Sequence, residues 1–498
     1  MNLEQLRNKK VAILGVGMEG VALASFLNDK VKNITLLDKM SESELGERAK
    51  SDGDNVLENI LNNSRYERLF GSGYLNDLNR FDVVFRSPGI PYLEPKIQQA
   101  KDMGIEISSQ IKLFFDLCPC PIIGVTGTKG KGTTSTLISL MLKKFQDTRD
   151  NNQTNSKSPL DSTRGRQITK SKRNVYLAGN IGEPAITLID KLSQDDIVIL
   201  ELSSFQLQDI EKSPHIAVVL NISIDHLDYH KDETEYKESK VSIVKHQSKD
   251  DFAVINQDYL TSFKFASETG AKVYYFSAKD SVDQGAYVKK VKNIEEIHEV
   301  VLRMDDKEEV ICRSNEVKLI GKHNLENIAA AAVAACIAGA DIKSISNAAK
   351  SFAGLPHRLE LIQEINGVKY YNDSFATSPG PTMAAIDSFK EPIHLILGGS
   401  SKGADFSSLA NFIKKSNVSS VNLIGAEAEK IRKALQDSGY DGDLSLLTPD
   451  INQIVKDVSN KAKSGDVILF SPACASFDMF KNYKDRGEKF KEAVLRFK

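Results

Sequence analysis

The sequence predicts an α/β protein built from parallel sheets that are covered by helices. Short apolar runs of strand length alternate with longer helical segments along most of the chain, which is the pattern of repeated strand–helix–strand units. Two glycine-rich turns, at residues 15–20 and 127–132, each follow an apolar run and precede an expected helix. Two proline-containing hinges, Cys118–Pro121 and Gly354–Pro356, divide the alternation into three stretches. We therefore expect domains at residues 1–117, 118–354 and 355–498.

The first and third stretches are expected to be Rossmann-like. In the first, strands are expected at Lys10–Leu14, Asn33–Asp38 and Phe81–Arg86, and a helix at Gly20–Asn28. In the third, strands are expected at residues 394–397, 421–424 and 467–470.

The central stretch is expected to hold a second parallel sheet. Its expected strands are residues 121–125, 175–178, 197–200, 216–221 and 252–255, with helices at 133–144 and 327–339. Residues 146–174 are rich in Asn, Ser, Thr, Lys and Arg and contain almost no large apolar side chain. Such a segment cannot bury enough surface to order itself, so we expect a flexible polar insertion there.

Composition argues against several classes of protein. The formal net charge is −2, so no whole-chain field attracts nucleic acid or a membrane surface. The longest apolar runs are too short to span a bilayer, and residues 1–5 lack the apolar core of a signal peptide. The five cysteines form no zinc pattern and are expected to be small buried thiols of a reducing compartment. We expect a cytoplasmic protein without a nucleic-acid partner or membrane insertion.

The stretch from Ile123 to Thr134 predicts a phosphate-binding loop. An apolar strand runs into a turn built on Gly127 and Gly130, and Lys131 stands directly before the expected helix. Glycines let backbone N–H groups point inward, the helix N-terminus adds partial positive charge, and the lysine reaches the terminal phosphates. The alternative, a glycine-rich turn with a solvated lysine, leaves the position of Lys131 unexplained. The chain is therefore expected to use a nucleoside triphosphate.

A second glycine motif lies near the N-terminus. Gly15, Gly17 and Gly20 follow the first expected strand, and Asp38 ends the next one. This is the dinucleotide fingerprint, in which the acid accepts from a ribose hydroxyl. A UDP-sugar has the same pyrophosphate and ribose groups as NAD, so either ligand fits the motif. A third possibility is a tight strand–helix turn that binds no nucleotide.

Further polar residues stand at strand ends and hinges. Glu201 ends an apolar strand, where a carboxylate near triphosphate is a natural Mg²⁺ ligand or simply an exposed side chain. His226 follows the next strand and is either a second metal ligand or structural. Lys240 lies on a charged helical stretch and, from its surroundings alone, is expected to be a solvated lysine. Arg358 follows the second hinge, where its planar fork could move onto a triphosphate.

These motifs together resemble a known family. The segments 127–131, 179–182, 201–206, 225–226, 323–324 and 355–358 occur with the residues and in the order found in the Mur ligases. Residues 371–377 and 471–478, with Leu202–Leu207, are similar to the branch that joins D-glutamate to UDP-N-acetylmuramoyl-L-alanine. The resemblance covers essentially the whole chain apart from the polar insertion.

The resemblance implies an ATP-dependent amide ligase of peptidoglycan precursor synthesis, working through an acyl phosphate. It implies ATP and two Mg²⁺ ions as cofactors, a monomer, and separate domains for the UDP-sugar, ATP and D-glutamate. The residues implied as catalytic are Lys131, Asn180, Glu201, His226, Lys240 and Arg358. Those implied in ATP binding are Gly127, Thr128, Lys129, Gly130, Lys131, Gly132, Thr133, Thr134, Asn324, Asn327, Arg358 and Asp373.

The substrate and metal positions are also implied by the resemblance. The UDP-sugar positions are Gly17, Met18, Glu19, Asp38, Lys39, Ser87, Pro88, Gly89, Ser203 and Gln206, and the D-glutamate positions are Thr377, Lys402, Ser476, Phe477 and Tyr483. The metal positions are Thr133, Glu201, His226 and Lys240, the last as a carbamate.

Three residues depart from the pattern of this branch. Gly132 stands where Ser or Thr is usual, so we expect Thr133 to supply the hydroxyl near Mg²⁺. Phe375 replaces a frequent Lys, and Tyr483 a frequent Phe. The competing hypotheses are a folylpolyglutamate-synthase-like ligase, an NAD-dependent dehydrogenase, and an ATP-binding regulatory protein with a decayed ligase site.

Overall fold

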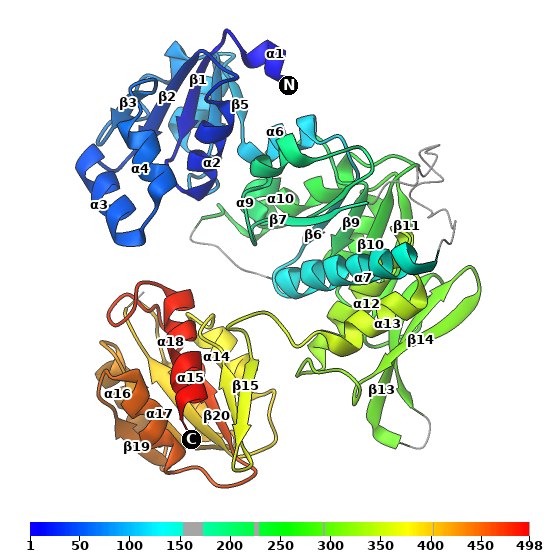
Figure 1. Ribbon diagram of the computed structural model, residues 1–498, viewed down its shortest axis with the longest axis vertical. Coiled ribbons are helices and arrows are strands. Elements are labelled where there is room, and N and C mark those ends of the chain that lie inside the picture. Colours follow the sequence, from blue (N-terminus) through cyan, green and yellow to red (C-terminus); the bar gives the residue numbers. More distant parts are fainter. Residues whose placement is uncertain (153–172, 224–228, 292–293, 402, 498) are drawn as a thin grey trace. The chain divides into compact units, whose positions relative to one another are not determined.

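The computed structural model describes residues 1–152, 173–223, 229–291, 294–401 and 403–497 (Figure 1). The chain divides into two compact units. The first comprises Met1–Glu316 and His323–Ser351, and the second comprises Val317–Lys322 and Phe352–Lys498. The first unit contains the N-terminal and central sheets, and the second unit contains the C-terminal sheet. The predicted boundaries at 117/118 and 354/355 stay predictions.

The N-terminal sheet is entirely parallel, with the order β3-β2-β1-β4-β5. Its strands are β1 (Lys10–Leu14), β2 (Asn33–Asp38), β3 (Glu67–Phe70), β4 (Val83–Arg86) and β5 (Glu106–Ser108). Its helices are α1 (Leu3–Leu6), α2 (Met18–Leu27), α3 (Glu42–Asp52), α4 (Asn55–Asn62), the short η1 (Leu78–Arg80), α5 (Pro95–Asp102) and α6 (Gln110–Leu117).

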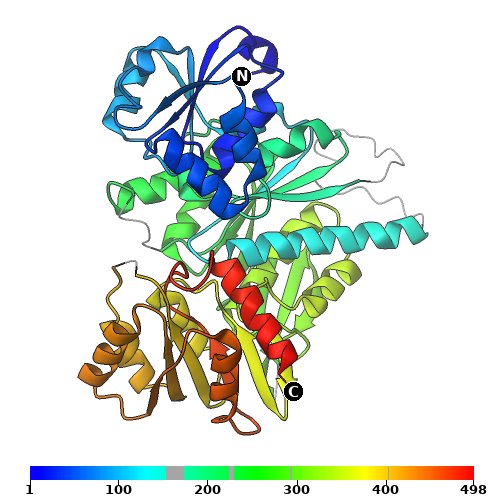
Figure 2. The same cartoon turned by 60° about the vertical axis from the view of Figure 1, so that its left-hand side comes forward.

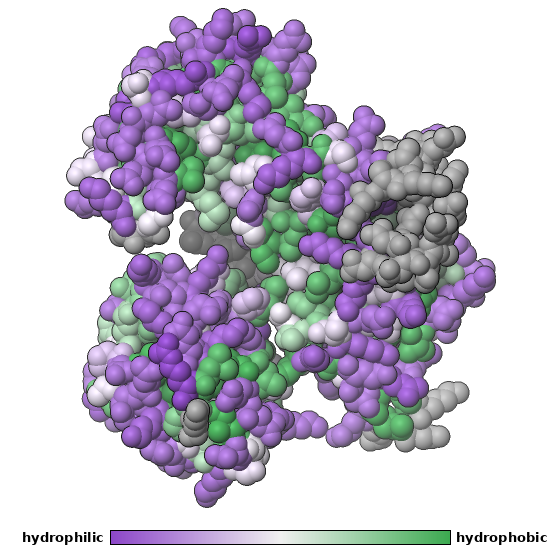
Figure 3. Space-filling view, viewed as in Figure 1, coloured by the Kyte–Doolittle hydropathy of each residue, from purple (hydrophilic) through white to green (hydrophobic). Residues whose placement is uncertain are grey.

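Strand β1 shows why the N-terminal sheet has helices on both faces. Val11 and Ile13 belong to one buried cluster, and Ala12 and Leu14 to another. Because successive side chains of a strand point to opposite faces, both faces of the sheet are covered. In the view of Figure 3 this part presents mostly hydrophilic side chains to solvent.

The central sheet has the order β14-β13-β12-β11-β10-β9-β6-β8-β7. The parallel strands are β6 (Ile122–Thr126), β7 (Val175–Gly179), β8 (Ile197–Glu201), β9 (Ile216–Val219), β10 (Phe252–Asn256), β11 (Lys272–Ser277) and β12 (Gly285–Val291). β13 (Ile294–Met304) and β14 (Lys307–Arg313) extend it antiparallel.

Helices on the central sheet include the long α7 (Lys131–Asn152), which is plain in both ribbon views (Figures 1 and 2). The others are η2 (Ala185–Lys191), α9 (Ser204–Leu207), α10 (Glu233–Lys245), α11 (Leu260–Phe263), η3 (Lys264–Ser267), α12 (His323–Ile337) and α13 (Ile342–Ser351). The alanines of α12 are fully buried between α7 and the sheet, because small side chains let the backbones approach closely.

The C-terminal sheet has the order β15-β16-β20-β17-β18-β19. Its strands are β15 (Glu360–Ile365), β16 (Val368–Asn372), β17 (Ile393–Gly398), β18 (Val418–Ile424), β19 (Asp443–Leu446) and β20 (Val467–Phe470), of which only β15 runs antiparallel to its neighbour. Helices α14 (Pro379–Ile386), α15 (Ser407–Lys414), α16 (Ala428–Ser438), α17 (Ile451–Ser459) and α18 (Tyr483–Arg496) cover it.

The predicted α/β class with largely parallel sheets is confirmed, but several details were wrong. Residues 146–152 continue α7 instead of starting the flexible insertion, because no glycine or proline stops the helix before Pro159. Residues 153–172 of the insertion lie outside the described residues. Helix α7 also begins at Lys131, two residues earlier than expected. The antiparallel strands β13, β14 and β15 were missed, because their many charged side chains hide the strand pattern.

No helix within the described ranges is both long enough and apolar enough to cross a membrane.

Candidate active site

Several polar segments gather at one edge of the central sheet. β7, β8, β6 and β9 are consecutive neighbours and run parallel. Asn180, Glu201, the glycine loop and Asn221 therefore follow or end adjacent strands at the same carboxyl edge, where open α/β sheets bind ligands. The sequence pointed to the glycine loop and to Glu201 at strand ends, the family resemblance added Asn180, and neither assigned a role to Asn221.

The glycine loop has the geometry of a phosphate cradle. Gly127 and Gly130 have φ values of +155° and +86°, a region that only glycine adopts readily. A Cβ on Gly130 would lie 2.4 Å from Asn327 Oδ1, and one on Gly127 would lie 2.7 Å from Leu220 Cβ. The loop backbone is thus held against β9 and α12 with no space for side chains.

Lys131 is the first residue of α7 and folds back over the loop. Its Nζ donates to the carbonyl oxygens of Gly127, at 2.9 Å, and Thr128, at 3.1 Å. The ammonium group therefore lies beside the cradle at the positive end of a helix, where a phosphate would be attracted. The neighbouring Lys129 is exposed and Gly132 is buried within the first turn of α7.

The two threonines after Gly132 have different surroundings. Thr134 is fully buried and its hydroxyl donates to Asn327 Oδ1 at 3.4 Å, while Asn327 Nδ2 donates to Asn324 Oδ1 at 3.0 Å. Asn324 and Asn327 thus support the glycine loop from α12. Thr133 precedes Thr134 in the first turn and is 6% exposed.

Glu201 and Asn180 lie in direct contact. Asn180 Nδ2 donates to Glu201 Oε1 at 2.9 Å, and Asn180 N donates to the Glu201 carbonyl oxygen at 2.9 Å. Gly179 has φ +100°, and a Cβ there would lie 2.4 Å from the Glu201 carbonyl oxygen. The glycine therefore permits the close approach that places the amide of Asn180 on the carboxylate.

Lys240 is buried, so the expectation of a solvated side chain was wrong. It is 2% exposed on α10, and its Nζ lies 3.4 Å from the Gly127 carbonyl oxygen and 3.5 Å from Thr126 Oγ1. The charged residues around it belong to the outer side of α10, whereas Lys240 faces the end of β6. The sequence pattern of this helix was misleading, because the charged residues next to Lys240 made its inward-facing position look like part of a solvated face.

Two predicted site residues cannot be placed. His226 and Lys402 lie outside the described residues.

A histidine that sequence reasoning missed links α9 with α10. The ring of His230 is buried, its Nδ1 lies 2.7 Å from Glu235 Oε2 and its Nε2 lies 2.9 Å from Ser204 Oγ. With Nδ1 donating to the carboxylate, Nε2 accepts the serine proton, a tautomer assigned from these partners. We call this set the Ser204–His230–Glu235 network. The only sequence signal for it was a histidine shortly after Asp225-His226.

The same network touches the phosphate loop through Tyr236. The Tyr236 ring meets His230 edge-on at 5.2 Å, and its hydroxyl lies 2.9 Å from Thr128 Oγ1. Lys240 Nζ lies 4.9 Å from the centre of the same ring. The position of α10, and with it Lys240, is therefore tied both to α9 and to the loop.

The N-terminal glycine motif forms a tight turn between β1 and α2. Gly15 has φ +92°, and a Cβ on Gly20 would lie 2.0 Å from the Gly15 carbonyl oxygen. Ser87 Oγ donates to that same oxygen at 2.8 Å. Asp38 accepts from the backbone N–H groups of Val16, at 2.7 Å, and Met40, at 2.9 Å. Asp38 therefore orders the turn itself, and only its remaining lone pairs are available to a ribose.

Glu19 and Gln206 join the fingerprint to the central sheet. Gln206 Nε2 donates to Glu19 Oε1 at 2.7 Å, and Gln206 Oε1 accepts from Ser203 N at 3.0 Å in the capping box of α9. Burial raises the pKa of Glu19 to about 7, although the Gln206 hydrogen bond opposes the shift. Met18, Lys39 and Gly89 are exposed around this point, and Gly17 and Pro88 are partly so.

Arg86 provides a second link between these sheets. Its guanidinium donates to the carbonyl oxygens of Ile90 and Phe205 and to the Tyr229 hydroxyl, and it lies 3.5 Å from Asp209. The side chains of Arg86 and Asp209 are 1% and 3% exposed. The UDP-sugar positions of both sheets are therefore brought together within the first unit.

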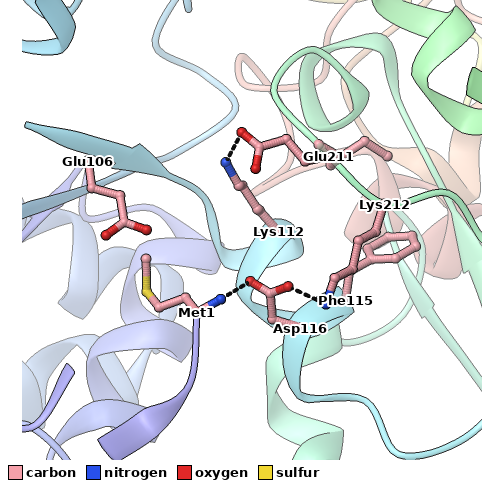
Figure 4. A pocket seen from close by; sticks show the side chains of 8 residues that line it. Met1, Glu106, Lys112, Phe115, Asp116, Glu211 and Lys212 are labelled. Carbon is pink, nitrogen blue, oxygen red and sulfur yellow. Dashed lines mark hydrogen bonds and ion pairs between the residues drawn. The ribbon is translucent and has the colours of Figure 1, made fainter. Parts of the chain in front are cut away.

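A charged cavity lies near the end of α6 (Figure 4). It has a volume of about 290 Å³. Asp116 accepts from the Met1 ammonium at 2.8 Å and from Lys212 at 2.6 Å, and Lys112 pairs with Glu211 at 2.7 Å. Burial would raise the pKa of Asp116, but the two cations outweigh it and the pKa falls below its ordinary value. These pairs fix α6 to residues 211–212.

In the second unit, Asp373 is the most strongly perturbed group among the predicted site residues. Ser471 Oγ donates to Asp373 Oδ2 at 2.7 Å, and Leu359 N donates to Oδ1 at 3.2 Å. Burial raises the pKa of Asp373 to about 7, despite these bonds and the nearby Arg358.

Arg358, Phe375 and Tyr483 form a contact that the sequence did not predict. The Arg358 guanidinium lies 5.7 Å from the Phe375 ring centre, and the Tyr483 ring meets Phe375 edge-on at 5.2 Å. Phe375, at a position where the resemblance leads one to expect Lys, makes a cation–π contact with Arg358. Tyr483 is another of the three residues that depart from the pattern of the resembled branch.

The remaining described positions for which the resemblance implies D-glutamate binding follow neighbouring strands. Thr377 follows β16, and Ser476 and Phe477 follow β20. Ser476 is 2% exposed and Phe477 is 72% exposed, with the Phe477 N–H donating to Ser400 Oγ at 3.0 Å. These segments lie at the carboxyl edge of the C-terminal sheet, as expected for a ligand site.

The three sheets match three family descriptions. Residues 9–109 match the Mur ligase MurD-like N-terminal domain, residues 125–335 the Mur ligase middle domain, and residues 357–474 the Mur ligase glutamate ligase domain. The chain belongs to the Mur ligase family. The resemblance noted in the sequence is thereby confirmed.

Named relatives cover nearly the whole chain. It is 39% identical over 496 residues to the UDP-N-acetylmuramoylalanine–D-glutamate ligase of Acetivibrio thermocellus, covering 99% of this chain and 97% of the relative. It is 36% identical to the enzyme of the same name from Symbiobacterium thermophilum, covering 98% of each chain.

Solved structures share this fold at low identity. The UDP-N-acetylmuramate-alanine ligase MurC of Thermotoga maritima aligns with a TM-score of 0.56 and 16% identity, over 98% of this chain and 100% of that chain. The MurF ligase of the same organism, in complex with ADP, aligns with a TM-score of 0.52 and 17% identity, over 99% and 97%. E. coli FolC with ADP aligns with a TM-score of 0.52 and 18% identity but covers 78% of this chain and 93% of that chain.

Proposed function

We propose that this Mur ligase uses ATP to join D-glutamate to UDP-N-acetylmuramoyl-L-alanine in peptidoglycan precursor synthesis. The supporting observation is a phosphate loop backed by Lys131, Glu201 and Lys240, in a chain similar over its full length to ligases of that name. In the proposed reaction, the substrate carboxylate attacks the γ-phosphate of ATP to give an acyl phosphate and ADP. The amine of D-glutamate then attacks the acyl carbon, and phosphate leaves as the amide forms.

The chain's own groups have distinct tasks in this scheme. Lys131 would neutralise phosphate charge at the loop, and the same task is proposed for Arg358. Asn180 orients the Glu201 carboxylate through its 2.9 Å hydrogen bond. Positioning and charge neutralisation are what phosphoryl transfer requires of a protein, because little covalent chemistry is left to it.

The donor groups near the loop fit Mg²⁺. Glu201 supplies a carboxylate and Thr133 a hydroxyl, and Mg²⁺ prefers such oxygen ligands. Asn221 Oδ1, which follows β9 at the same edge, is buried without a hydrogen-bond partner among the described residues. We propose two ions, with Lys240 as a carbamate and His226 completing the ligands. When bound, Mg²⁺ would supply charge to offset that of the phosphates.

The remaining assignments are carried as proposals. Gly17, Met18, Glu19, Asp38, Lys39, Ser87, Pro88, Gly89, Ser203 and Gln206 would contact the UDP-sugar. Thr377, Lys402, Ser476, Phe477 and Tyr483 would hold D-glutamate, and a lysine beside hydroxyls suits a dicarboxylate.

The test is release of phosphate from ATP by purified protein with UDP-N-acetylmuramoyl-L-alanine. D-glutamate, L-glutamate, L-lysine and a folate substrate are offered separately. Turnover with D-glutamate alone is expected. Equal turnover with L-glutamate, or turnover with folate, contradicts the proposed substrates and favours the folylpolyglutamate-synthase-like alternative.

A matched pair of lysines tests the phosphate loop. Lys131→Ala is expected to abolish turnover, because its ammonium lies over the cradle. Lys129→Ala, two residues earlier and exposed, is expected to retain most of it. Similar losses in both variants would contradict the role given to Lys131.

A further inference from the structure

Cys118 and Cys120 form a close thiol pair that the proposed ligase reaction does not use. They flank Pro119 between the end of α6 and the start of β6. Their Sγ atoms are 3.6 Å apart, and Cys118 Sγ also lies 3.5 Å from the Cys120 carbonyl oxygen. With the Cys118 proton directed to that oxygen, the Cys120 S–H can donate to Cys118 Sγ.

The backbone on either side of the pair is held in place. Cys118 N donates to the Phe114 carbonyl oxygen at 2.9 Å, and Ile122 N donates to His215 Nδ1 at 2.9 Å. Asp116, two residues before the pair, is fixed by Lys212 in the charged cavity of Figure 4. The two thiols therefore stay near one another in the folded chain. Closing a disulfide, with S–S of about 2.05 Å, requires the sulfur atoms to approach by roughly 1.5 Å.

Exposure gives the two thiols different roles. Cys118 is partly exposed, whereas Cys120 is 2% exposed and packed in the core. A small oxidant in solution therefore meets Cys118 first. Cys120 is then the nearest thiol to whatever forms on Cys118, which is the arrangement of an attacking and a resolving cysteine.

The other three cysteines are much less reactive by comparison. The hydrogen bond from the Cys120 thiol lowers the pKa of Cys118, although burial opposes it. Burial instead raises the pKa of Cys312 and Cys474 to about 12 and that of Cys336 to about 11. Because the thiolate is the reactive form, Cys118 reacts ahead of these three.

We propose that Cys118 and Cys120 are a reversible two-thiol modification site for hydrogen peroxide. The Cys118 thiolate attacks one peroxide oxygen, the O–O bond breaks, and a sulfenic acid and hydroxide form. The Cys120 sulfur then attacks the Cys118 sulfur. The S–O bond breaks, and hydroxide leaves with the Cys120 proton as water. Two electrons pass from the two thiols to the peroxide.

The size of the ring favours redox chemistry over a structural role. The bridge encloses a single residue, so it removes little conformational entropy from the unfolded chain. A bridge that contributes little to stability is readily reduced again by a thiol. The site is independent of the ligase function proposed above.

The test uses the full chain treated with hydrogen peroxide, quenched with catalase, unfolded in guanidinium chloride and then alkylated with iodoacetamide. The tryptic peptide Leu113–Lys129 carries both thiols and is analysed by mass spectrometry. We expect it to lack two hydrogens and to be alkylated only after reduction with dithiothreitol. Peptides with Cys312, Cys336 and Cys474 are expected to be alkylated directly. Direct alkylation of both Cys118 and Cys120 after peroxide overturns the proposal, as does a bridge to another cysteine.

Two serine variants separate the attacking from the resolving thiol. In Cys120→Ser, Cys118 is expected to stop at the sulfenic acid and to take up dimedone. In Cys118→Ser, Cys120 is expected to remain a thiol at the same peroxide dose. Serine is close to cysteine in size, and thermal melting verifies that each variant is folded. Oxidation of Cys120 in Cys118→Ser, or no dimedone adduct at Cys118 in Cys120→Ser, overturns the assigned order.

Discussion

Two histidines in different units have nearly the same partners but lie at opposite ends of their sheets. His230 contacts Ser204 and Glu235, and His394 contacts Ser420 Oγ at 2.8 Å and Asp466 Oδ2 at 3.1 Å. Both rings are buried, as are both serines. In neither set is the serine exposed to a substrate, so neither is a hydrolytic triad.

The two networks differ in the part of the structure that each one stabilises. His394 is near the start of β17, Ser420 near the start of β18, and Asp466 directly precedes β20, so this set closes the amino edge of the C-terminal sheet. Ser204 follows Glu201 by three residues, and Glu235 lies in the first turn of α10, the helix that carries Lys240. Ligands bind at carboxyl edges of such sheets. The same chemistry therefore stabilises the fold at one edge and positions the candidate active site at the other.

The largest effect on ligase turnover is expected from Lys240, whose helix the His230 network holds in position. Lys240→Ala should remove most ligase turnover without unfolding the protein, because a carbamate there would supply oxygen ligands to Mg²⁺. Added bicarbonate should raise the activity of wild-type enzyme depleted of carbon dioxide. Lys237→Ala, on the same helix but more exposed, is the control and should keep its activity. Near-normal turnover in Lys240→Ala would show that the lysine is only structural.

The two histidines themselves should differ in what their loss changes. His230→Gln should lower kcat by roughly 10- to 100-fold, the usual cost of removing a group that orients metal ligands, and should raise the Mg²⁺ concentration needed for half activity. His394→Gln should leave kcat per folded molecule unchanged. Equal loss of kcat in both variants would contradict the different roles given to the two histidines. An unchanged Mg²⁺ requirement in His230→Gln would do the same.

Loss of the His394 ring should lower the thermal stability of the protein and leave its turnover normal. His394→Ala leaves Ser420 and Asp466 without their ring partner, and an unsatisfied buried polar group costs about 1–3 kcal/mol. We expect a lower melting temperature by calorimetry and normal turnover below the transition. An unchanged melting temperature would mean that water or a neighbouring side chain replaces the ring at no cost.

The smallest expected effect is a pH dependence of the His394 network. Burial would raise the pKa of Asp466, but hydrogen bonds from the Lys463 backbone and His394 outweigh it and hold the pKa below its ordinary value. A carboxyl whose pKa is lower in the folded state stabilises the fold above its unfolded pKa, and this is lost as the pH falls. The melting temperatures of wild type and Asp466→Asn should thus differ most near pH 7 and converge toward pH 3. A constant difference would argue against an ionised Asp466.

Local sequence determined the elements that precede the site. The apolar runs of β1, β6, β8 and β20 are long enough and bounded clearly enough to be recognised alone, and the strained glycines at 127 and 130 mark a turn that no other residue adopts easily. The order of motifs was sufficient to indicate the family. These features depend on residues that are adjacent in the chain. They can therefore be recognised from a single sequence without knowledge of the fold.

Only the tertiary structure decided which polar residues meet. Lys240 was expected to be solvated from its charged neighbours, yet packing of α10 buries it beside the glycine loop. His230 gained its role from Ser204, 26 residues away. Cys118 differs from Cys312, Cys336 and Cys474 through its contact with the thiol of Cys120. Burial and hydrogen bonding are set by contacts between distant segments, so the chemistry of these side chains follows from the fold and not from their neighbours in sequence.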